Sequence, residues 1–243
     1  MADGLSLILL AGGLGTRLRG LYPDLPKPMV PVAGRPFLEW ILRYWAAQGV
    51  ADFVLSTGHR SDAIDAFVRS APIPGARIRQ HVETSPLGTG GAVRAAALAF
   101  PSGDAFLVAN GDSLVLADLH GSPGPLSLGG CDAVMLAVNV DDASRYGSVK
   151  TGARGELIGF EEKRPGRGLV NAGVYLFSRR VLELFPDGAP LSMETQVFPA
   201  LLQSGATIRV EAVTAPFLDI GTPDSLALAE KFVLSNLDQF GLA

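Results

Sequence analysis

Residues 6–18 read SLILLAGGLGTRL, an apolar run that passes directly into a loop with three glycines. A continuous apolar run of this kind is typical of a strand buried on both faces of a parallel sheet. Glycines after such a strand let the backbone approach a ligand closely and point several N–H groups at one anion. The stretch therefore predicts a central strand followed by an anion-binding loop.

Strand and helix patterns alternate through the first 110 residues. Apolar residues recur at helical spacing in residues 37–48 and 90–100, and Ser61 is placed to cap a further helix. The strands expected between these helices cover residues 52–57, 77–82 and 105–109. Such alternation indicates βαβ units and a mainly parallel sheet with helices on both faces.

The second half of the chain is richer in strands than in helices. Strand patterns are expected at residues 132–140, 147–151, 157–160 and 170–177. The triplet Thr222-Pro223-Asp224 is typical of a helix start, and this helix is expected to run to about residue 237. We therefore expect a single α/β domain with a Rossmann-like mixed, mainly parallel sheet. Cys131 opens an apolar run and is expected to be a buried strand residue.

Composition excludes several classes of protein. Of the 243 residues, 48% are hydrophobic and 18% are charged, which excludes a disordered chain. A net charge of −4 argues against a nucleic-acid partner, which requires a broad basic surface. One Cys and three scattered His residues give neither a disulfide nor a zinc-type spacing. Without a basic leader or an apolar run of about 20 residues, we expect a cytoplasmic protein with no membrane segment.

Two cationic side chains near the glycine loop are candidates for phosphate binding. The planar guanidinium of Arg17 suits phosphate oxygens, and Lys27 lies between two prolines that favour a stiff, extended loop. The loop is neither a Walker A motif nor a dinucleotide fingerprint, because no Gly-Lys-Ser/Thr follows and Leu18 stands at the third glycine position. A merely tight strand exit and a surface lysine are the alternatives at this point.

Longer motifs carry a family resemblance. The segments AGGLGTRL (11–18) and PKPMVPVAGRPFLEW (26–40) together resemble the signature of sugar-1-phosphate nucleotidyltransferases, and within them most resemble the heptose- and mannose-1-phosphate guanylyltransferases. The similarity continues in order through ETSPLGTGG (83–91), NGDS (110–113), YG (146–147), EEK (161–163), NAGVY (171–175) and FLDIGT (217–222). These motifs cover nearly the whole chain.

The resemblance implies transfer of a nucleotidyl group from an NTP, with GTP favoured, to a heptose or mannose 1-phosphate. The products are an NDP-sugar for cell-surface polysaccharide synthesis and pyrophosphate, and Mg²⁺ is the implied cofactor. Residues 1–112 are then mainly the nucleotide-binding half, and residues 113–243 mainly the sugar-phosphate-binding half. Uridylyl or thymidylyl transfer to another sugar, a non-catalytic nucleotide-sugar sensor and assembly into a homo-oligomer all stay open.

The resemblance also assigns roles to individual residues. The catalytic residues are Arg17, Lys27 and Asp112. Nucleotide-binding residues are Leu10, Ala11, Gly12, Gly13, Gly15, Thr16, Glu83, Pro86, Gly88 and Thr89. Substrate-binding residues are Gly111, Tyr146, Gly147, Glu162, Lys163, Asn171, Gly173 and Asp219, and the metal ligands are Asp112 and Asp219.

Elementary chemistry fits this set, because two polyanions must meet at the α-phosphorus and cations offset their charge. The attacking phosphate oxygen is already ionised, so neither a general base nor a covalent intermediate is needed. Glu83 is expected to accept the paired N–H donors of guanine. The alternatives are a turn-forming role for Asp112, a solvated strand end for Glu83 and a solvated loop for residues 161–163.

Overall fold

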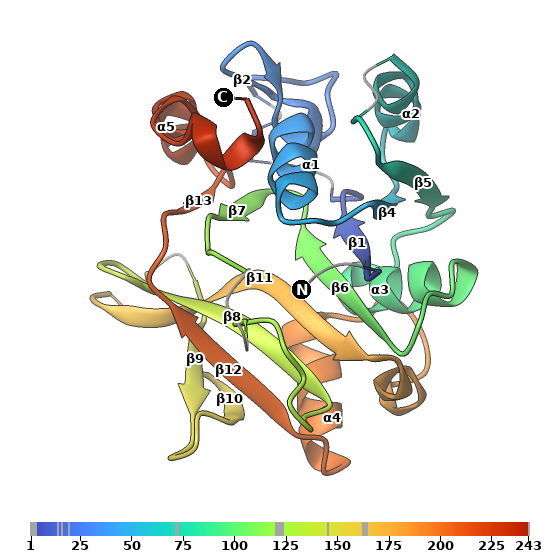
Figure 1. Ribbon diagram of the computed structural model, residues 1–243, viewed down its shortest axis with the longest axis vertical. Coiled ribbons are helices and arrows are strands. Elements are labelled where there is room, and N and C mark those ends of the chain that lie inside the picture. The colour runs from blue at the N-terminus through green and yellow to red at the C-terminus, as the bar shows by residue number, and fades with distance from the viewer. Residues whose placement is uncertain are drawn as a thin grey trace.

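The computed structural model describes residues 4–13, 15, 17–18, 20–70, 73–119, 124–144, 146–161 and 165–242. Within these ranges nine strands form one sheet in the order β10-β9-β11-β6-β1-β4-β5, with β8 paired to β11 and β12 to β8 (Figure 1). The sheet combines parallel and antiparallel pairs, and this agrees with the mixed α/β domain expected from the sequence.

The parallel half of the sheet is built from the first half of the chain. Its strands are β1 (Ser6–Leu10), β4 (Asp52–Thr57), β5 (Arg77–Val82) and β6 (Ala105–Asn110). Strand β1 pairs with β4 on one side and with β6 on the other. The chain therefore builds outward to β5 and returns across β1, which makes a topological switch point between β1 and β6. Ligands in open α/β sheets bind at such points, beyond the carboxyl ends of the strands.

Strand β11 joins this half to the antiparallel half. It pairs antiparallel with β6 through Val174–Ser178 and with β8 along its other edge. The strands of this half are β8 (Ala133–Val140), β9 (Ser148–Thr151), β10 (Leu157–Glu161), β11 (Gly168–Ser178) and β12 (Ile208–Val213). The first four were predicted to within two residues at each end. Strand β12 was not predicted.

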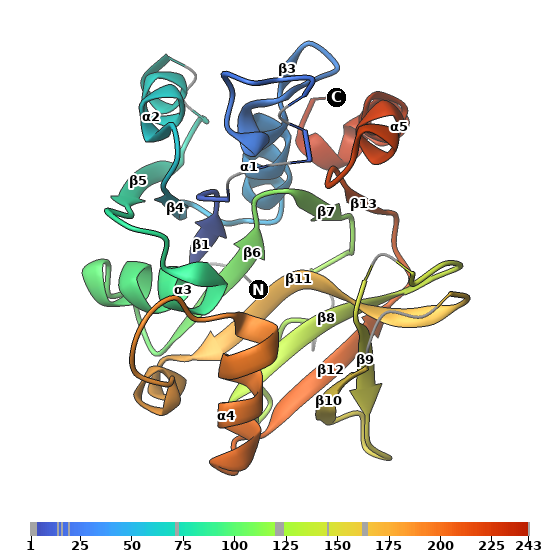
Figure 2. The same cartoon turned by 180° about the vertical axis from the view of Figure 1, so that it is seen from behind.

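Helices cover both faces of the sheet (Figures 1 and 2). They are α1 (Phe37–Ala47), α2 (Ser61–Ser70), α3 (Gly88–Ala99), α4 (Phe198–Gln203) and α5 (Pro223–Leu234). Leu7 and Leu9 pack in one core with α1, α2 and α5, whereas Ile8 packs in a second core with α3 and α4. Successive strand side chains point to opposite faces, and both faces of β1 are buried, so Leu7 to Leu10 are all apolar, whereas Ser6 at the start of the strand is a buried polar residue.

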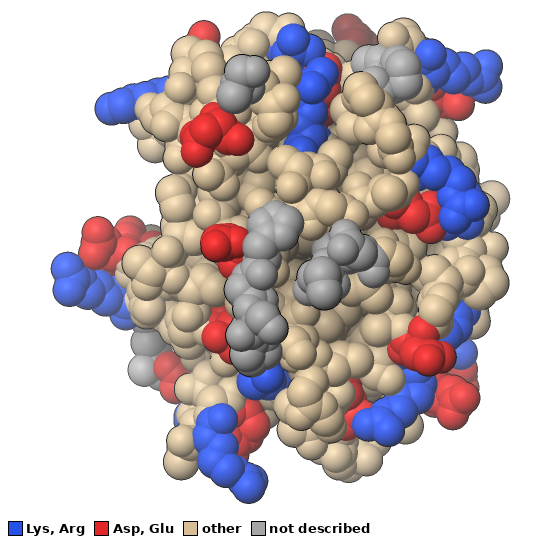
Figure 3. Space-filling view, viewed as in Figure 1, with Lys and Arg blue, Asp and Glu red and all other residues tan. Residues whose placement is uncertain are grey.

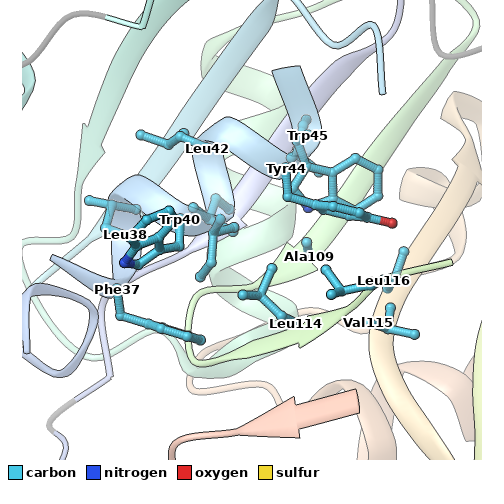
Figure 4. Close-up of a cluster of buried hydrophobic side chains, with 14 of the residues drawn as sticks. Phe37, Leu38, Trp40, Leu42, Tyr44, Trp45, Ala109, Leu114, Val115 and Leu116 are labelled. Atoms are coloured by element: carbon cyan, nitrogen blue, oxygen red, sulfur yellow. The ribbon is translucent and has the colours of Figure 1, made fainter. Parts of the chain in front are cut away.

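Helix α1 buries its aromatic side chains against the end of β6 and the short strand that follows it (Figure 4). Trp40, Tyr44 and Trp45 are almost fully buried, and Ala109 and Leu114 lie in the same core. The short strand β7 (Ser113–Val115) pairs antiparallel with β13 (Phe217–Asp219). This small ribbon follows the carboxyl end of β6. Asp112 directly precedes β7 and Asp219 ends β13, so both expected metal ligands lie at the same end of the ribbon.

The other short elements surround this framework. They are β2 (Pro31–Val32), β3 (Arg35–Pro36), the 3₁₀ turns Lys27–Met29, Arg179–Leu184 and Leu237–Phe240, and a π-helical turn, Met193–Val197. Cys131 is half-buried and precedes β8, so its assignment as a buried strand residue was wrong. Helix α5 ends at Leu234 rather than near residue 237, because Asn236 leaves helical geometry and its side chain donates to the carbonyl of Phe232.

The start of α5 has the capping hydroxyl of Thr222 that the sequence predicted, and Ser225 completes a capping box. The Thr222 hydroxyl accepts the Ser225 N–H at 3.3 Å, and the Ser225 hydroxyl accepts the Thr222 N–H at 3.1 Å. Thr222→Ala is expected to lower the free energy of unfolding by about 1 kcal/mol, because the Ser225 N–H loses its side-chain acceptor. Urea denaturation tests this, with Thr222→Ser as the control that keeps the hydroxyl. Equal stability of the Ala and Ser variants would contradict the prediction.

The surface shows no dominant charge on the face seen in Figure 3. Basic and acidic side chains are interspersed there and no broad basic patch forms among the described side chains. Within the part of the chain that the structure describes, no helix is both long and apolar enough to cross a membrane.

Candidate active site

Four parallel strands deliver their following residues to one edge of the sheet. Gly12 follows β1, Gly58 follows β4, Glu83 follows β5 and Gly111 follows β6. The backbone N–H of Gly111 bonds to the carbonyl of Leu10 at 2.9 Å, so the loops after β1 and β6 are in direct contact. Residues distant in the sequence therefore meet at the switch point.

A cavity of about 510 Å³ opens at this edge. Ten of the residues expected from the sequence line it, namely Leu10, Gly12, Gly13, Lys27, Glu83, Pro86, Gly88, Thr89, Gly111 and Asp112. Seven further lining residues had been given no individual role, namely Pro28, Gly58, His59, Thr84, Ser85, Ala92 and Asn110. The volume is in the range of small-molecule pockets.

Gly12 and Glu83 are in close contact at the wall of this cavity. A Cβ atom at Gly12 would lie 2.7 Å from Glu83 Oε1, so only glycine fits without displacing the carboxylate. Glu83 Oε1 accepts the Ser56 hydroxyl at 3.2 Å, and Oε2 accepts the Leu87 N–H at 3.1 Å. The half-buried carboxylate is thus fixed by protein donors, which argues against the solvated strand end considered above.

Lys27 and Asp112 form the charged pair of the cavity. Lys27 Nζ lies 2.6 Å from Asp112 Oδ2, and their side chains are 14% and 35% exposed. Lys27 opens a 3₁₀ turn rather than standing in an extended loop, because the Met29 N–H bonds to the carbonyl of Pro26. Gly15, with φ of +56°, packs against the Cβ of Lys27. The glycine loop and the lysine are therefore held together.

Asp219 is brought beside Asp112 by the β7–β13 ribbon. Ser113 is the register partner of Asp219, and the Ile220 N–H bonds to the carbonyl of Asp112 at 3.0 Å. Asp219 Oδ1 accepts the Gly221 N–H at 2.6 Å. Among the described residues, no group of three or more His, Cys, Asp or Glu side chains is arranged to hold a metal ion.

Asn171 belongs to a polar network outside the lining of the cavity. Its Nδ2 donates to Tyr175 Oη at 2.7 Å and to Glu194 Oε1 at 3.0 Å, while its Oδ1 accepts the Gly173 N–H at 2.9 Å. Burial raises the pKa of the Tyr175 hydroxyl, and the charges of Glu194 and Asp112 raise it further. The phenol therefore stays protonated at neutral pH.

The network adjoins the cavity through two contacts. A Cβ at Gly173 would meet the side chain of Asn110, which lines the cavity. The Met193 N–H, next to Glu194, donates to Thr89 Oγ1 at 2.9 Å, and Thr89 lines the cavity as well.

The remaining expected residues lie around this centre. Ala11 is buried beneath the glycine loop, and Arg17 is exposed and does not line the cavity. Tyr146 is half-buried with its ring 5.9 Å from that of Phe217, two residues before Asp219, and Gly147 is half-buried beside β10. Thr16, Glu162 and Lys163, which were predicted to bind nucleotide or substrate, lie outside the described residues.

Sequence reasoning missed Ser56, Tyr175 and Glu194. Ser56 did carry a signal, since a polar residue stands near the end of the apolar strand 52–57. Glu194 carried none, because the irregular segment after Leu191 shows no clear period and its partner Asn171 is 23 residues away.

Sequence comparison identifies related proteins. A family model described as nucleotidyl transferase matches residues 6–236. The chain is 36% identical over 220 residues to a mannose-1-phosphate guanylyltransferase of Mycobacterium tuberculosis, covering 89% of this chain and 61% of that protein. It is 32% identical over 220 residues to a D-glycero-alpha-D-manno-heptose 1-phosphate guanylyltransferase of Campylobacter jejuni, covering 89% of this chain and 95% of that protein.

Structure comparison agrees with these relatives. The crystal structure of HddC from Yersinia pseudotuberculosis complexed with GMP-PN superimposes with a TM-score of 0.82 at 32% identity. The match covers 93% of this chain and 98% of HddC. The fold is thus shared over nearly the full length of both proteins.

Proposed function

Because this chain belongs to the nucleotidyl transferase family, we propose that it transfers a guanylyl group from GTP to a heptose or mannose 1-phosphate. The products are a GDP-sugar and pyrophosphate, with cell-surface polysaccharide synthesis as the use of the sugar. The heptose and mannose guanylyltransferase relatives support this choice of base and sugar.

One observation carries the proposal. A single cavity holds the Lys27–Asp112 pair together with the Glu83 carboxylate, beyond the carboxyl ends of β1, β5 and β6. The charged pair suits the phosphates of a nucleoside triphosphate, and Glu83 suits a base that offers N–H donors. On this proposal, residues 1–112 mainly bind the nucleotide and residues 113–243 mainly bind the sugar phosphate.

Magnesium fits the residues beside this cavity. Asp112 and Asp219 supply carboxylate oxygens, which are hard ligands. Their backbones are neighbours, because the Ile220 N–H bonds to the carbonyl of Asp112. Asp112 already pairs with one cation, the ammonium of Lys27. Mg²⁺ is commonly held by one or two carboxylates together with substrate phosphates, so two carboxylates suffice. When bound, the ion neutralises phosphate charge and orients the α-phosphate for in-line displacement.

The residues of this chain then have distinct tasks. Lys27, fixed by its turn and by Gly15, places a positive charge where negative charge moves toward the leaving pyrophosphate. Backbone N–H groups of the glycine loop contact the triphosphate, and Arg17 joins them once the nucleotide is bound. The sugar phosphate attacks with an oxygen that is already ionised, so no side chain has to remove a proton.

The sugar is proposed to lie in the part of the cavity that adjoins the Asn171 network. Both N–H donors of the Asn171 amide are used within the protein, on Tyr175 and Glu194. The side chain of Asn171 thus fixes the wall that faces the sugar, while Tyr146, Gly147, Glu162, Lys163 and Gly173 complete the proposed sugar-phosphate site.

Glu83 is proposed to select guanine. Guanine presents N1–H and N2–H₂ side by side, whereas uracil and thymine present one N–H between two carbonyl oxygens that repel a carboxylate. Glu83→Gln is expected to narrow the ratio of kcat/KM for GTP over UTP by about 10-fold or more, because an amide cannot accept at both positions. Steady-state kinetics with both nucleotides measures this. A wild-type enzyme that prefers UTP or dTTP would refute the assignment.

Pyrophosphate release tests the function as a whole. The four NTPs, with dTTP added, are each combined with mannose 1-phosphate, a heptose 1-phosphate and glucose 1-phosphate in the presence of Mg²⁺. GTP with a mannose- or heptose-type phosphate is expected to give the highest kcat/KM. Greatest activity with UTP or dTTP would favour uridylyl or thymidylyl transfer. No pyrophosphate release in any combination would favour a non-catalytic nucleotide-sugar sensor.

A further inference from the structure

Ser56 is a buried hydroxyl aimed at the carboxylate that faces the nucleotide cavity. Its exposed fraction is 0%, and it lies one residue before the end of β4, away from the lining of the cavity itself. Its Oγ donates to Glu83 Oε1 at 3.2 Å. Neither the sequence motifs nor the proposed chemistry uses this residue.

The backbone around Ser56 makes this hydroxyl a rigid donor. Ser56 is the register partner of Leu10 in β1 and of His81 in β5, so strands on both sides hold it. Its carbonyl accepts the N–H of Ala11 at 2.7 Å, one residue before Gly12. The glycine loop and the Ser56 hydroxyl thus have a fixed position relative to each other, and both contact Glu83.

The two carboxylate oxygens of Glu83 accept hydrogen bonds from different protein donors. One carboxylate oxygen accepts the Ser56 hydroxyl, and the other accepts the Leu87 N–H. Each oxygen has two lone pairs, so one acceptor position on each oxygen is left for a ligand. Two protein donors, one per oxygen, set the plane of the carboxylate. A carboxylate held in one plane matches two adjacent N–H groups of a base better than a rotating one.

We infer that Ser56 is a positioning residue for base selection, acting by holding the Glu83 carboxylate in the orientation that accepts paired N–H donors. The inference rests on the proposed role of Glu83 in guanine binding. Removing the hydroxyl leaves Glu83 with one fixed oxygen, so discrimination falls while the phosphate-transfer chemistry at Lys27 and Asp112 continues.

The test uses Ser56→Ala and Ser56→Cys, the second filling the same space with a weak donor. Both are expected to narrow the GTP over UTP ratio of kcat/KM by about 10-fold, the scale of a hydrogen bond to a charged group. The change is expected in KM for GTP, with kcat within about 3-fold of wild type because the reacting centre is untouched. Calorimetric binding of GDP and UDP gives a second readout without turnover.

Ser6→Ala is the matched control. Ser6 is also a buried serine of the same sheet, 2% exposed in β1, and its hydroxyl contacts Ser102 far from the cavity. This variant is expected to keep the wild-type nucleotide ratio.

The outcomes separate this inference from the proposed function. If Glu83→Gln narrows the ratio but both Ser56 variants keep it within 2-fold of wild type, the positioning role is overturned and base reading by Glu83 stands. An equal loss for GTP and UTP in the Ser56 variants overturns it as well, since that marks a general structural role. If Glu83→Gln itself leaves the GTP over UTP ratio unchanged, the proposed role of Glu83 in selecting guanine is refuted, and the role of Ser56 that rests on it is refuted as well.

Discussion

Asp112→Asn is expected to lower kcat by at least about 100-fold, the scale on which single electrostatic groups act in such sites. The substitution removes the charge that pairs with Lys27 at 2.6 Å and that is proposed to hold magnesium. Asp219→Asn is expected to have an effect of the same order, because its backbone adjoins that of Asp112 and both carboxylates are assigned to one ion.

The measurement is pyrophosphate release at saturating GTP over a range of Mg²⁺ concentrations, with thermal unfolding to show that the fold is intact. Asp187→Asn is the control, because the Asp187 side chain is 99% exposed and pairs with Arg94 away from the cavity. Full activity of either Asn variant in Mg²⁺, with the Asp187 control also active, would remove that residue from the metal site.

Lys27→Ala is expected to cut kcat/KM by about 100-fold or more, since no other lysine or arginine among the described residues lines the cavity. Lys27→Arg is expected to recover little of this loss. The ammonium acts as a point charge in a tight turn beside Gly15, and a planar fork on a longer side chain does not reproduce that position.

Kinetics of the two Lys27 variants with GTP and the preferred sugar 1-phosphate measure this effect. Lys231→Ala on the exposed side of α5 serves as the control for loss of one positive charge. Near-wild-type kinetics of Lys27→Ala would show that Lys27 is not needed for activity, as expected of a lysine that merely belongs to a proline-rich loop.

The central strands β1, β4 and β6 of the parallel half could be predicted from the sequence because their apolar runs are buried on both faces. The bounds of β4 and β5 match residues 52–57 and 77–82 as expected, although β5, RIRQHV, has no apolar run. Strand β12 and the π-helical turn Met193–Val197 were missed. The first does alternate apolar and charged residues, since Arg209 and Glu211 stand between apolar neighbours, and this strand signal was overlooked; the second has no regular period.

The candidate site was predictable in its parts but not in its connections. Lys27 and Asp112 were each selected, yet their pairing spans 85 residues and forms only when the segment after β1 meets the residues after β6. Glu83 was selected for the base, but its bonds to Ser56 and Leu87 follow from the register of β4 and β5. The periodicity of apolar residues in the sequence predicts local helices and strands, whereas these contacts form only when the strands assemble into the sheet.

The central claim is that a sugar phosphate oxygen attacks the α-phosphorus of GTP. Mannose 1-phosphate or a heptose 1-phosphate, labelled with ¹⁸O in its non-bridging phosphate oxygens, is incubated with GTP, Mg²⁺ and the enzyme, and the products are analysed by mass spectrometry. The expected result is a GDP-sugar that retains the complete label, together with an equal amount of unlabelled pyrophosphate. Labelled pyrophosphate, or release of inorganic phosphate without a GDP-sugar, would contradict the account.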